Sequence, residues 1–199
     1  SPPLQRRGFS PAFHVNSLAG QLMPPIRPTL AIIGAGRVGR ALGRLLRQQG
    51  WRIGPVVTRS RKTARAAARS IGAGRPQARL DASVLASDVV LITTPDRAIA
   101  SVAAQLARHA VAQGARRFDG GALRLSSRQG PREFAGTIVL HTNGALDRSV
   151  LAPIQRLGAA TGSLHPLQTF SGRAVPKLDG CICAIEGTRA ALRAARRIC

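Results

Sequence analysis

The sequence contains no tyrosine, one tryptophan and five phenylalanines, and it has only eight acidic residues against 30 lysines and arginines. Nucleic-acid bases stack on aromatic side chains, so this scarcity argues against specific nucleic-acid binding despite the formal charge of +22. Lys62 and Lys177 are the only lysines, and the arginines are scattered rather than gathered in one motif. This distribution favours a general arginine excess, part of which would attract a polyanionic cofactor.

Long apolar runs are also missing: none approaches the ~20 residues that a membrane-spanning helix needs, and we expect no membrane partner. Cysteine is scarce, and Cys181, Cys183 and Cys199 all lie late in the chain. Nothing around them has the spacing of metal ligands, so we expect no metal site and reduced thiols in a cytoplasmic protein. The apolar fraction of 44% is sufficient for a packed core.

Residues 1–28 show no apolar periodicity and contain several prolines, which indicates an irregular leader. Met23 is the only methionine, so one interpretation is that the native protein starts there and residues 1–22 are upstream sequence. The alternative is an organelle-targeting presequence, because residues 6–10 are basic and free of acids. The leader lacks the long amphipathic helix of such presequences, which favours the first interpretation.

The chain is organised around one motif, in which the apolar residues 30–33 lead directly into Gly34-Ala35-Gly36-Arg37-Val38-Gly39. An unbroken apolar run is typical of a buried parallel strand, and an amphipathic helical pattern follows the glycines. Gly-x-Gly-x-x-Gly between a strand and a helix predicts a dinucleotide site. Gly34 allows the tight turn, Gly36 the approach of a pyrophosphate and Gly39 the packing of helix on strand. Arg37 and Val38 begin a helix whose free N–H groups face the phosphates.

The end of the second expected strand, residues 51–57, bears on the type of cofactor. In NAD-specific folds an acidic residue there binds the ribose 2′-hydroxyl, whereas arginine accommodates a 2′-phosphate. No acidic residue precedes Asp81, and the strand is followed by Thr58, Arg59 and Ser60. These three residues, with Arg37, predict NADP. The alternative is that the arginines only belong to the general excess, in which case NAD remains open.

Apolar runs alternate with helical segments up to residue 164, which predicts a doubly wound parallel sheet of the α/β class. We expect further strands over residues 89–92, 137–140, 160–164 and 181–185, and a surface insertion over residues 113–136. Parallel strands end at the ligand crevice of such a sheet. We therefore expect Thr93, Thr94 and Pro95, which follow the third strand, to touch the cofactor.

Two histidines, His141 and His165, lie at the ends of later strands, on the edge where a cofactor would lie. Hydride transfer requires a nearby group that takes or gives a proton, and histidine titrates near neutrality. We predict that both are catalytic, with a structural role as the alternative. Asn143, Gly144 and Gln168 are candidates for orienting a substrate carbonyl or carboxylate. The alternative for them is ordinary turn chemistry.

Four stretches, residues 31–39, 90–96, 139–146 and 162–170, resemble a bacterial family of oxidoreductases described as Rossmann-like and DUF2520 proteins. The first stretch is shared with every Rossmann enzyme, and the last two together are specific. The chain is similar, more distantly, to pyrroline-5-carboxylate reductases, prephenate dehydrogenases and deazaflavin (F420)-dependent NADP reductases. His165-Pro166 resembles the pair whose histidine contacts the substrate hydroxyl in prephenate dehydrogenases. The family usually has serine where this chain has Asn143.

The resemblance implies an enzyme that transfers a hydride between NADP and a small hydroxy acid, oxo acid or imine. It implies a Rossmann domain over residues 29–164 and, over residues 165–199, the start of a helical domain that completes the substrate pocket and a homodimer. Because that domain would continue beyond residue 199, we expect Ile182, Ile185 and Leu192 to lie uncovered. The alternative function is a non-catalytic dinucleotide-binding sensor, which needs residues 34–39 but neither His141 nor His165.

Overall fold

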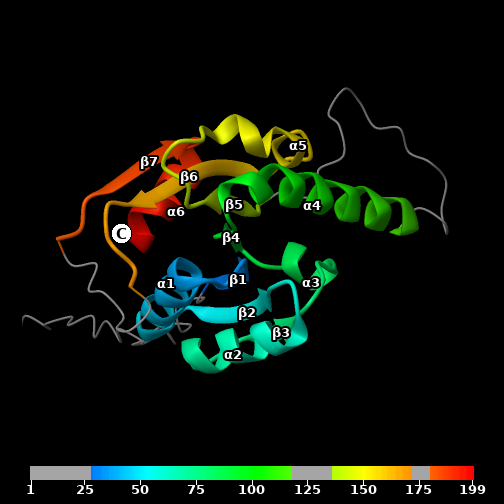
Figure 1. Cartoon of the computed structure of the whole chain (residues 1–199). Helices are drawn as coiled ribbons and strands as arrows, with labels where there is room; N and C mark the ends of the chain where they lie inside the picture. The colour runs from blue at the N-terminus through cyan, green and yellow to red at the C-terminus, as the bar shows by residue number, and fades with distance from the viewer. Residues whose placement is uncertain (1–27, 118–135, 172–179) are drawn as a thin grey trace, which may run out of the picture.

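The computed structural model describes residues 28–117, 136–171 and 180–199, which form one seven-stranded sheet covered by helices on both faces (Figure 1). The strands are β1 (Thr29–Ile33), β2 (Arg52–Val57), β3 (Arg75–Gln77), β4 (Val89–Ile92), β5 (Ile138–His141), β6 (Ala160–Pro166) and β7 (Cys183–Gly187). The helices are α1 (Arg37–Gln48), α2 (Arg61–Ile71), α3 (Ala82–Leu85), α4 (Asp96–Arg117), α5 (Ala152–Gln155) and α6 (Arg189–Ile198), with a 3₁₀ turn, η1, over Arg148–Leu151.

The strand order is β3-β2-β1-β4-β5-β6-β7, and each pair is parallel up to β6. The first six strands thus follow the order 3-2-1-4-5-6 of the Rossmann fold, whose ligand crevice lies where the order reverses, between β1 and β4. The prediction of a doubly wound α/β sheet is confirmed. The last strand, β7, pairs with β6 in the antiparallel direction.

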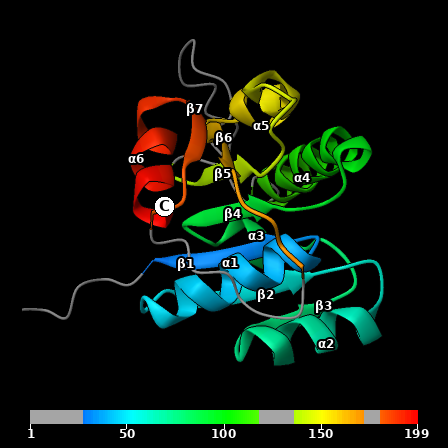
Figure 2. The ribbon, with the colours of Figure 1, turned by 60° about the vertical axis from the view of Figure 1, so that its left-hand side comes forward.

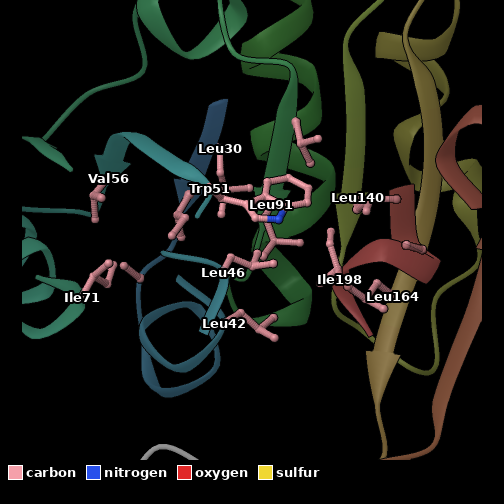
Figure 3. Packing of buried hydrophobic residues seen from close by; sticks show 14 of the residues in the cluster. Leu30, Leu42, Leu46, Trp51, Val56, Ile71, Leu91, Leu140, Leu164 and Ile198 are labelled. Carbon is pink, nitrogen blue, oxygen red and sulfur yellow. The ribbon is translucent and has the colours of Figure 1, made fainter. Parts of the chain in front are cut away.

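Two apolar cores lie on opposite faces of the sheet, because successive residues of each strand point to opposite sides. On one face Leu30 and Ile32 pack with α1 and α6 (Figure 3). On the other, Ala31 and Ile33 pack with α3, α4 and α5. Figure 2 shows these helices on either side of the central strands. Full burial on both faces explains why β1 and β4 are unbroken apolar runs.

The last part of the described chain continues this sheet. The sequence predicts that a second domain begins at residue 165, whereas β6 runs on to Pro166, β7 extends the sheet, and α6 covers it. The expectation of uncovered apolar residues holds for Ile182, which is 72% exposed. Ile185 and Leu192 are half-buried. They are covered to this extent because α6 lies on the sheet through its alanines and Ile198.

Three local features differ from the sequence expectations. The short edge strand β3 was not expected, and α4 runs on to Arg117, past the expected start of the insertion at residue 113. The spacing of Val150, Leu151, Ile154 and Leu157 predicts one helix, but the structure has a 3₁₀ turn followed by one short helix whose second residue is Pro153. The predicted leader and residues 118–135 of the predicted insertion lie outside the described residues. Within the described residues, no helix is long and apolar enough to cross a membrane.

Candidate dinucleotide and proton-transfer site

The turn between β1 and α1 is built on a glycine that no other residue can replace without strain. Gly34 has φ 88°, a left-handed conformation that side chains rarely adopt. A Cβ atom there would lie 2.5 Å from Thr94 Cγ2 and 2.7 Å from the Thr94 backbone nitrogen. The backbone N–H of Gly34 donates to the Val57 carbonyl at 2.8 Å. Gly34 thus allows the loops after β1, β2 and β4 to meet.

The other two glycines have different surroundings. Gly36 is exposed and extended, with φ −76°, and the nearest atom to a Cβ there would be the Gly34 carbonyl oxygen at 3.8 Å. It is the N-cap of α1, and no side chain caps this helix. Gly39 is buried, and a Cβ there would collide with the Thr93 hydroxyl and lie 3.2 Å from Ile32 Cγ2. Gly36 thus leaves open space at the start of α1, here called the cradle. Gly39 allows the helix to pack on the sheet.

This cradle fits the phosphates of a dinucleotide. The first turn of α1 begins with Arg37, which is exposed, and Val38, which is half-buried. Free N–H groups and the positive dipole end of a helix together bind anions. Arg40 Nε donates to the Gly36 carbonyl at 3.1 Å and so stabilises the turn. The sequence analysis missed this contact.

The loop after β4 adds one free polar group to the cradle. The Thr93 hydroxyl donates to the Gly34 carbonyl at 2.8 Å, so it supports the glycine turn. The Thr94 hydroxyl is buried and has no hydrogen-bond partner among the described residues. A buried hydroxyl without a partner is costly, and a polar ligand beside Gly34 would satisfy it. Pro95 follows as an exposed residue.

At the end of β2, two of the three predicted cofactor residues hold the start of α2. Ser60 caps this helix by accepting from the Thr63 N–H at 3.2 Å, and the Thr58 hydroxyl contacts the Thr63 hydroxyl at 2.6 Å. Arg59 is exposed, as are Arg61 and Lys62. The cations that could reach a 2′-phosphate are therefore Arg59 and its two neighbours, of which the sequence analysis did not propose Arg61 and Lys62.

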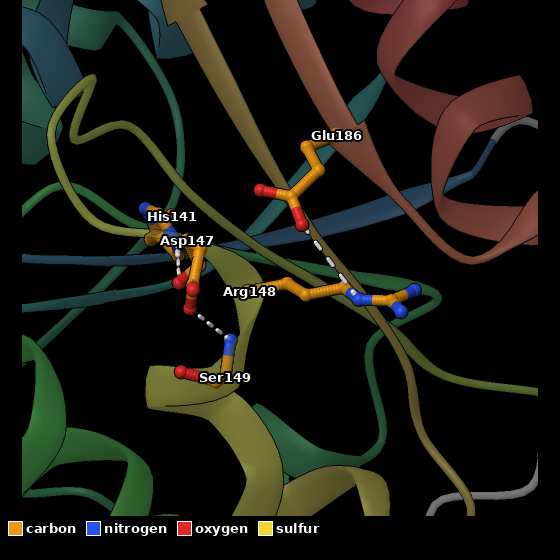
Figure 4. Close-up of polar contacts among 5 residues, drawn as sticks. All are labelled: His141, Asp147, Arg148, Ser149 and Glu186. Carbon is orange, nitrogen blue, oxygen red and sulfur yellow. Dashed lines mark hydrogen bonds and ion pairs between the residues drawn. The ribbon is translucent and has the colours of Figure 1, made fainter.

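His141 lies at the end of a strand, as the sequence analysis expects, but it is fully buried there. It belongs to β5, pairs with Ile92 and Ser163 in the neighbouring strands, and has 0% exposure. Its Nε2 donates to the Asp147 carbonyl at 3.2 Å (Figure 4), and its buried Nδ1 has no partner among the described residues. A side chain with no exposed surface favours the structural alternative for His141. Its catalytic role stays a prediction.

Burial lowers the pKa of His141, and the Asp147 carbonyl and the carboxylates of Glu186, Asp147 and Asp96 offset this only in part. In the unfolded chain the pKa is near its ordinary value of 6.5. Below that pH the unfolded chain therefore binds more protons than the folded protein, and the free energy of unfolding falls as the pH falls.

We expect this loss to approach ~1.4 kcal/mol per pH unit between the two pKa values of His141, and to be absent when the side chain cannot titrate. The comparison is urea unfolding of the wild type and of His141→Gln at about pH 7.5 and about pH 5.5. All other ionisable groups are common to both proteins, so the difference isolates His141. Equal losses in the two proteins would contradict the prediction.

His165, the second predicted catalytic residue, is half-buried near the end of β6. Its Nδ1 donates to the Thr142 carbonyl at 3.1 Å. The backbone N–H of Thr142 in turn donates to the Ile92 carbonyl at 3.2 Å, at the end of β4. Contacts thus connect His165 through the ends of β5 and β4 to the loop that contains Thr94. The prediction that His165 is catalytic remains a prediction, and its position fits that role.

The three predicted substrate residues, Asn143, Gly144 and Gln168, differ in their surroundings. Gly144 is exposed and its backbone lies against the His165 ring. Asn143 uses its side-chain oxygen within its own turn, accepting from the N–H groups of Ala145 at 2.7 Å and Leu146 at 2.6 Å. Only its amide N–H₂ group remains for a ligand. Gln168 is exposed just beyond β6, and its side-chain oxygen accepts from the Thr169 N–H at 3.1 Å.

The described residues contain no group of three or more histidines, cysteines or acidic residues that could hold a metal ion. The three cysteines are free. Burial is the main cause that raises the pKa of Cys199 to about 12, and that of Cys181 is raised as well. These thiols remain protonated and unreactive at neutral pH.

The fold and the glycine turn define a Rossmann-like protein, and comparisons with known proteins agree. Residues 29–114 match the family described as NADP oxidoreductase, coenzyme F420-dependent. No curated protein matches the sequence significantly.

Three solved structures are similar to this chain. They are a protein from Bacteroides fragilis described as an NADP oxidoreductase, a prephenate dehydrogenase from A. aeolicus in complex with NAD+, and a pyrroline-5-carboxylate reductase from Coxiella burnetii. Their TM-scores are 0.60, 0.58 and 0.57, and their sequence identities are 20%, 16% and 16%. Each match covers 86% of this chain, but only 56%, 56% and 55% of the other chains.

The chain therefore spans about half the length of these structures. The resemblance to the reductase and dehydrogenase families is confirmed at the level of fold. Membership of the DUF2520 family stays a prediction.

Proposed function

We propose that this chain forms the dinucleotide-binding part of an NADP-dependent oxidoreductase that acts on a small hydroxy acid, oxo acid or imine. One observation carries the proposal: the open cradle at Gly36 and the half-buried His165 lie at the same edge of the sheet, near the carboxyl ends of β1 and β6, two parallel strands that β4 and β5 separate. The match of residues 29–114 to an NADP oxidoreductase family supports it.

In this proposal each residue has a limited task. The N–H groups at the start of α1 bind the pyrophosphate above Gly36, and the Thr94 hydroxyl donates to the same ligand. Arg59 binds the 2′-phosphate. The bound nicotinamide supplies hydride chemistry. His165 donates its Nδ1–H to the Thr142 carbonyl, which leaves Nε2 to hold or release a proton at the substrate oxygen or nitrogen.

Turnover is tested by following NADPH oxidation with imines and 2-oxo acids, and NADP⁺ reduction with hydroxy acids. The assay uses this chain and the chain extended by a homologous helical domain. Turnover by either protein, lost in His165→Asn, supports the proposal. Tight NADPH binding without turnover in both proteins would instead indicate a non-catalytic sensor.

We expect Arg59→Ala to reduce the preference for NADP over NAD by roughly tenfold to a hundredfold, because one charge-assisted hydrogen bond contributes ~1.5–3 kcal/mol. Binding of both cofactors is measured by calorimetry at low salt. Arg69→Ala is the matched control: it removes the same charge from an exposed position in the last turn of α2, the helix that follows Arg59. An unchanged preference in Arg59→Ala, or an equal loss in both variants, would remove the argument for NADP.

We also propose a cytoplasmic homodimer in which a helical domain covers the edge of the sheet beside β7. Exposed apolar side chains support this: Leu167 is 58% and Ile182 is 72% exposed, and the Leu167 N–H donates to the Ile182 carbonyl at 2.8 Å. Single exposed residues are common on monomers. Two neighbours of this size between the end of β6 and the start of β7 favour a covering domain.

A further inference from the structure

Residues 142–147, here called the histidine loop, are fixed at both ends. At the start, the Thr142 N–H donates to the Ile92 carbonyl at 3.2 Å. At the end, the Asp147 carbonyl accepts from His141 Nε2 at 3.2 Å. Between them, the Asn143 side chain holds a tight turn. The fully buried imidazole of His141 thus ties the far end of the loop back to β5.

The loop in turn contacts the other histidine at two places. The Thr142 carbonyl accepts from His165 Nδ1 at 3.1 Å. The Gly144 backbone lies against the His165 ring, so that a Cβ at Gly144 would be 2.6 Å from Cδ2 and 2.7 Å from Nε2. The first contact specifies which nitrogen of His165 carries the proton, and the second limits where the ring can lie.

We propose that His141 is a positioning residue: by holding the Asp147 carbonyl, it fixes the histidine loop, and the loop fixes the tautomer and orientation of His165. The inference rests on the proposed function, in which His165 Nε2 exchanges a proton with the substrate. His141 itself touches neither cofactor nor substrate.

The chemistry of the site explains why an imidazole would be used here. An apolar side chain of similar size would fill the same space without leaving Nδ1 buried and unpaired. Compared with an apolar side chain, the histidine offers in addition one N–H donor, which is directed at the Asp147 carbonyl. Because its pKa is lowered by burial, His141 provides this donor as a neutral group.

Beyond Asp147, further contacts brace the same end of the loop. The Asp147 carboxylate caps η1 by accepting from the Ser149 N–H at 2.8 Å, and the hydrogen bonds from Ser149 lower its pKa. Arg148 Nε lies 3.7 Å from Glu186 Oε1 on β7, in an exposed ion pair (Figure 4). Exposed pairs of this kind contribute little, so the buried His141 contact is the main polar tie at this end of the loop.

Nitrogen NMR can test this directly, because the ¹⁵N shifts of an imidazole distinguish its two tautomers. In the ¹⁵N-labelled protein, at a pH where both histidines are neutral, we expect His165 to favour the Nδ1–H form by about tenfold, the ratio given by one ordinary hydrogen bond. His141→Gln retains an N–H donor and should keep most of this preference. His141→Phe has none and should lose most of this preference.

Two further variants separate positioning from general disturbance of the core. Thr161→Val changes another fully buried residue of the neighbouring strand, whose hydroxyl has no partner among the described residues, and should leave the His165 signals unchanged. Gly144→Ala, at an exposed position, should shift them by displacing the ring. This variant keeps the test of the loop contact valid if His141→Phe fails to fold.

A mixed tautomer of His165 in the wild type would overturn the proposal. So would a preference that survives in both His141→Phe and Gly144→Ala, or one that is lost equally in Thr161→Val. These measurements need no cofactor or substrate. The proposal can therefore hold if no oxidoreductase activity is found, and it can fail while activity is present.

Discussion

Replacing Gly36 with alanine is expected to weaken dinucleotide binding by about 100-fold or more and to leave the free energy of unfolding within ~1 kcal/mol of the wild type. A methyl group at this position meets no protein atom closer than 3.8 Å, and the backbone already has a negative φ. The folded protein therefore accepts the change. The methyl group would occupy the space in which a pyrophosphate approaches the helix N-terminus.

The measurement is paired: calorimetric titration with NADPH, and urea unfolding of the same two proteins. Gly136→Ala is a reference, because a Cβ at Gly136 meets no atom within 4 Å. Gly136 precedes β5 and therefore lies at the amino-terminal ends of the strands, away from the cradle. Its left-handed φ of 90° costs stability, so only its affinity is compared. Undiminished NADPH binding in Gly36→Ala would show that the turn after β1 does not hold the phosphates.

Replacing Gly34 with alanine is expected to have the opposite effect, a loss of about 2–5 kcal/mol in the free energy of unfolding. A left-handed conformation costs an alanine roughly 1–2 kcal/mol, and overpacking adds about 1–3 kcal/mol. The new Cβ would lie 2.7–2.8 Å from backbone atoms of Thr94, which cannot rotate away as a side-chain tip can. For a domain of marginal stability this is a large part of the total.

Urea unfolding at equilibrium measures the loss, with Gly36→Ala as the internal control two residues away. A loss of less than about 1 kcal/mol would mean that the Thr94 backbone moves to accommodate the methyl group. In that case the contact between the loops after β1 and β4 would not fix the crevice.

The sheet was predictable because its signals are local. Residues 30–33 and 89–92 are unbroken apolar runs, and such runs belong to strands covered on both faces. The edge strand β3 gives no such signal. It is three residues long, contains Pro76, and forms only because β2 offers it free hydrogen-bonding groups. Its partner lies some twenty residues earlier in the chain, so its own sequence does not reveal it.

The candidate site, too, was predictable only where its signals are local. The glycine turn follows from its own spacing, and the structure gives Gly34 and Gly39 the contacts that this spacing requires. The burial of His141 depends on its cover, since η1 and Asp147 close over the ring only after the loop has turned back. One signal was available: His141 lies two residues after Val139, and alternate residues of a strand face the same side. That spacing places His141 on the same face as Val139, which packs in the core with α4 and α5.

The position of α6 has a consequence for how this chain folds during synthesis. Ala195 and Ile198 complete the same core that contains Leu30, Leu46 and Trp51, and Arg197 lies 6.0 Å from the centre of the Trp51 ring. Ribosomes add ~5–20 residues per second, so roughly 7–30 s pass between the appearance of Trp51 and that of Ile198. During this time the core of the nascent chain lacks its last helix. The nascent chain is therefore most prone to aggregate in this interval, and a chaperone that holds the first half would protect it until α6 emerges.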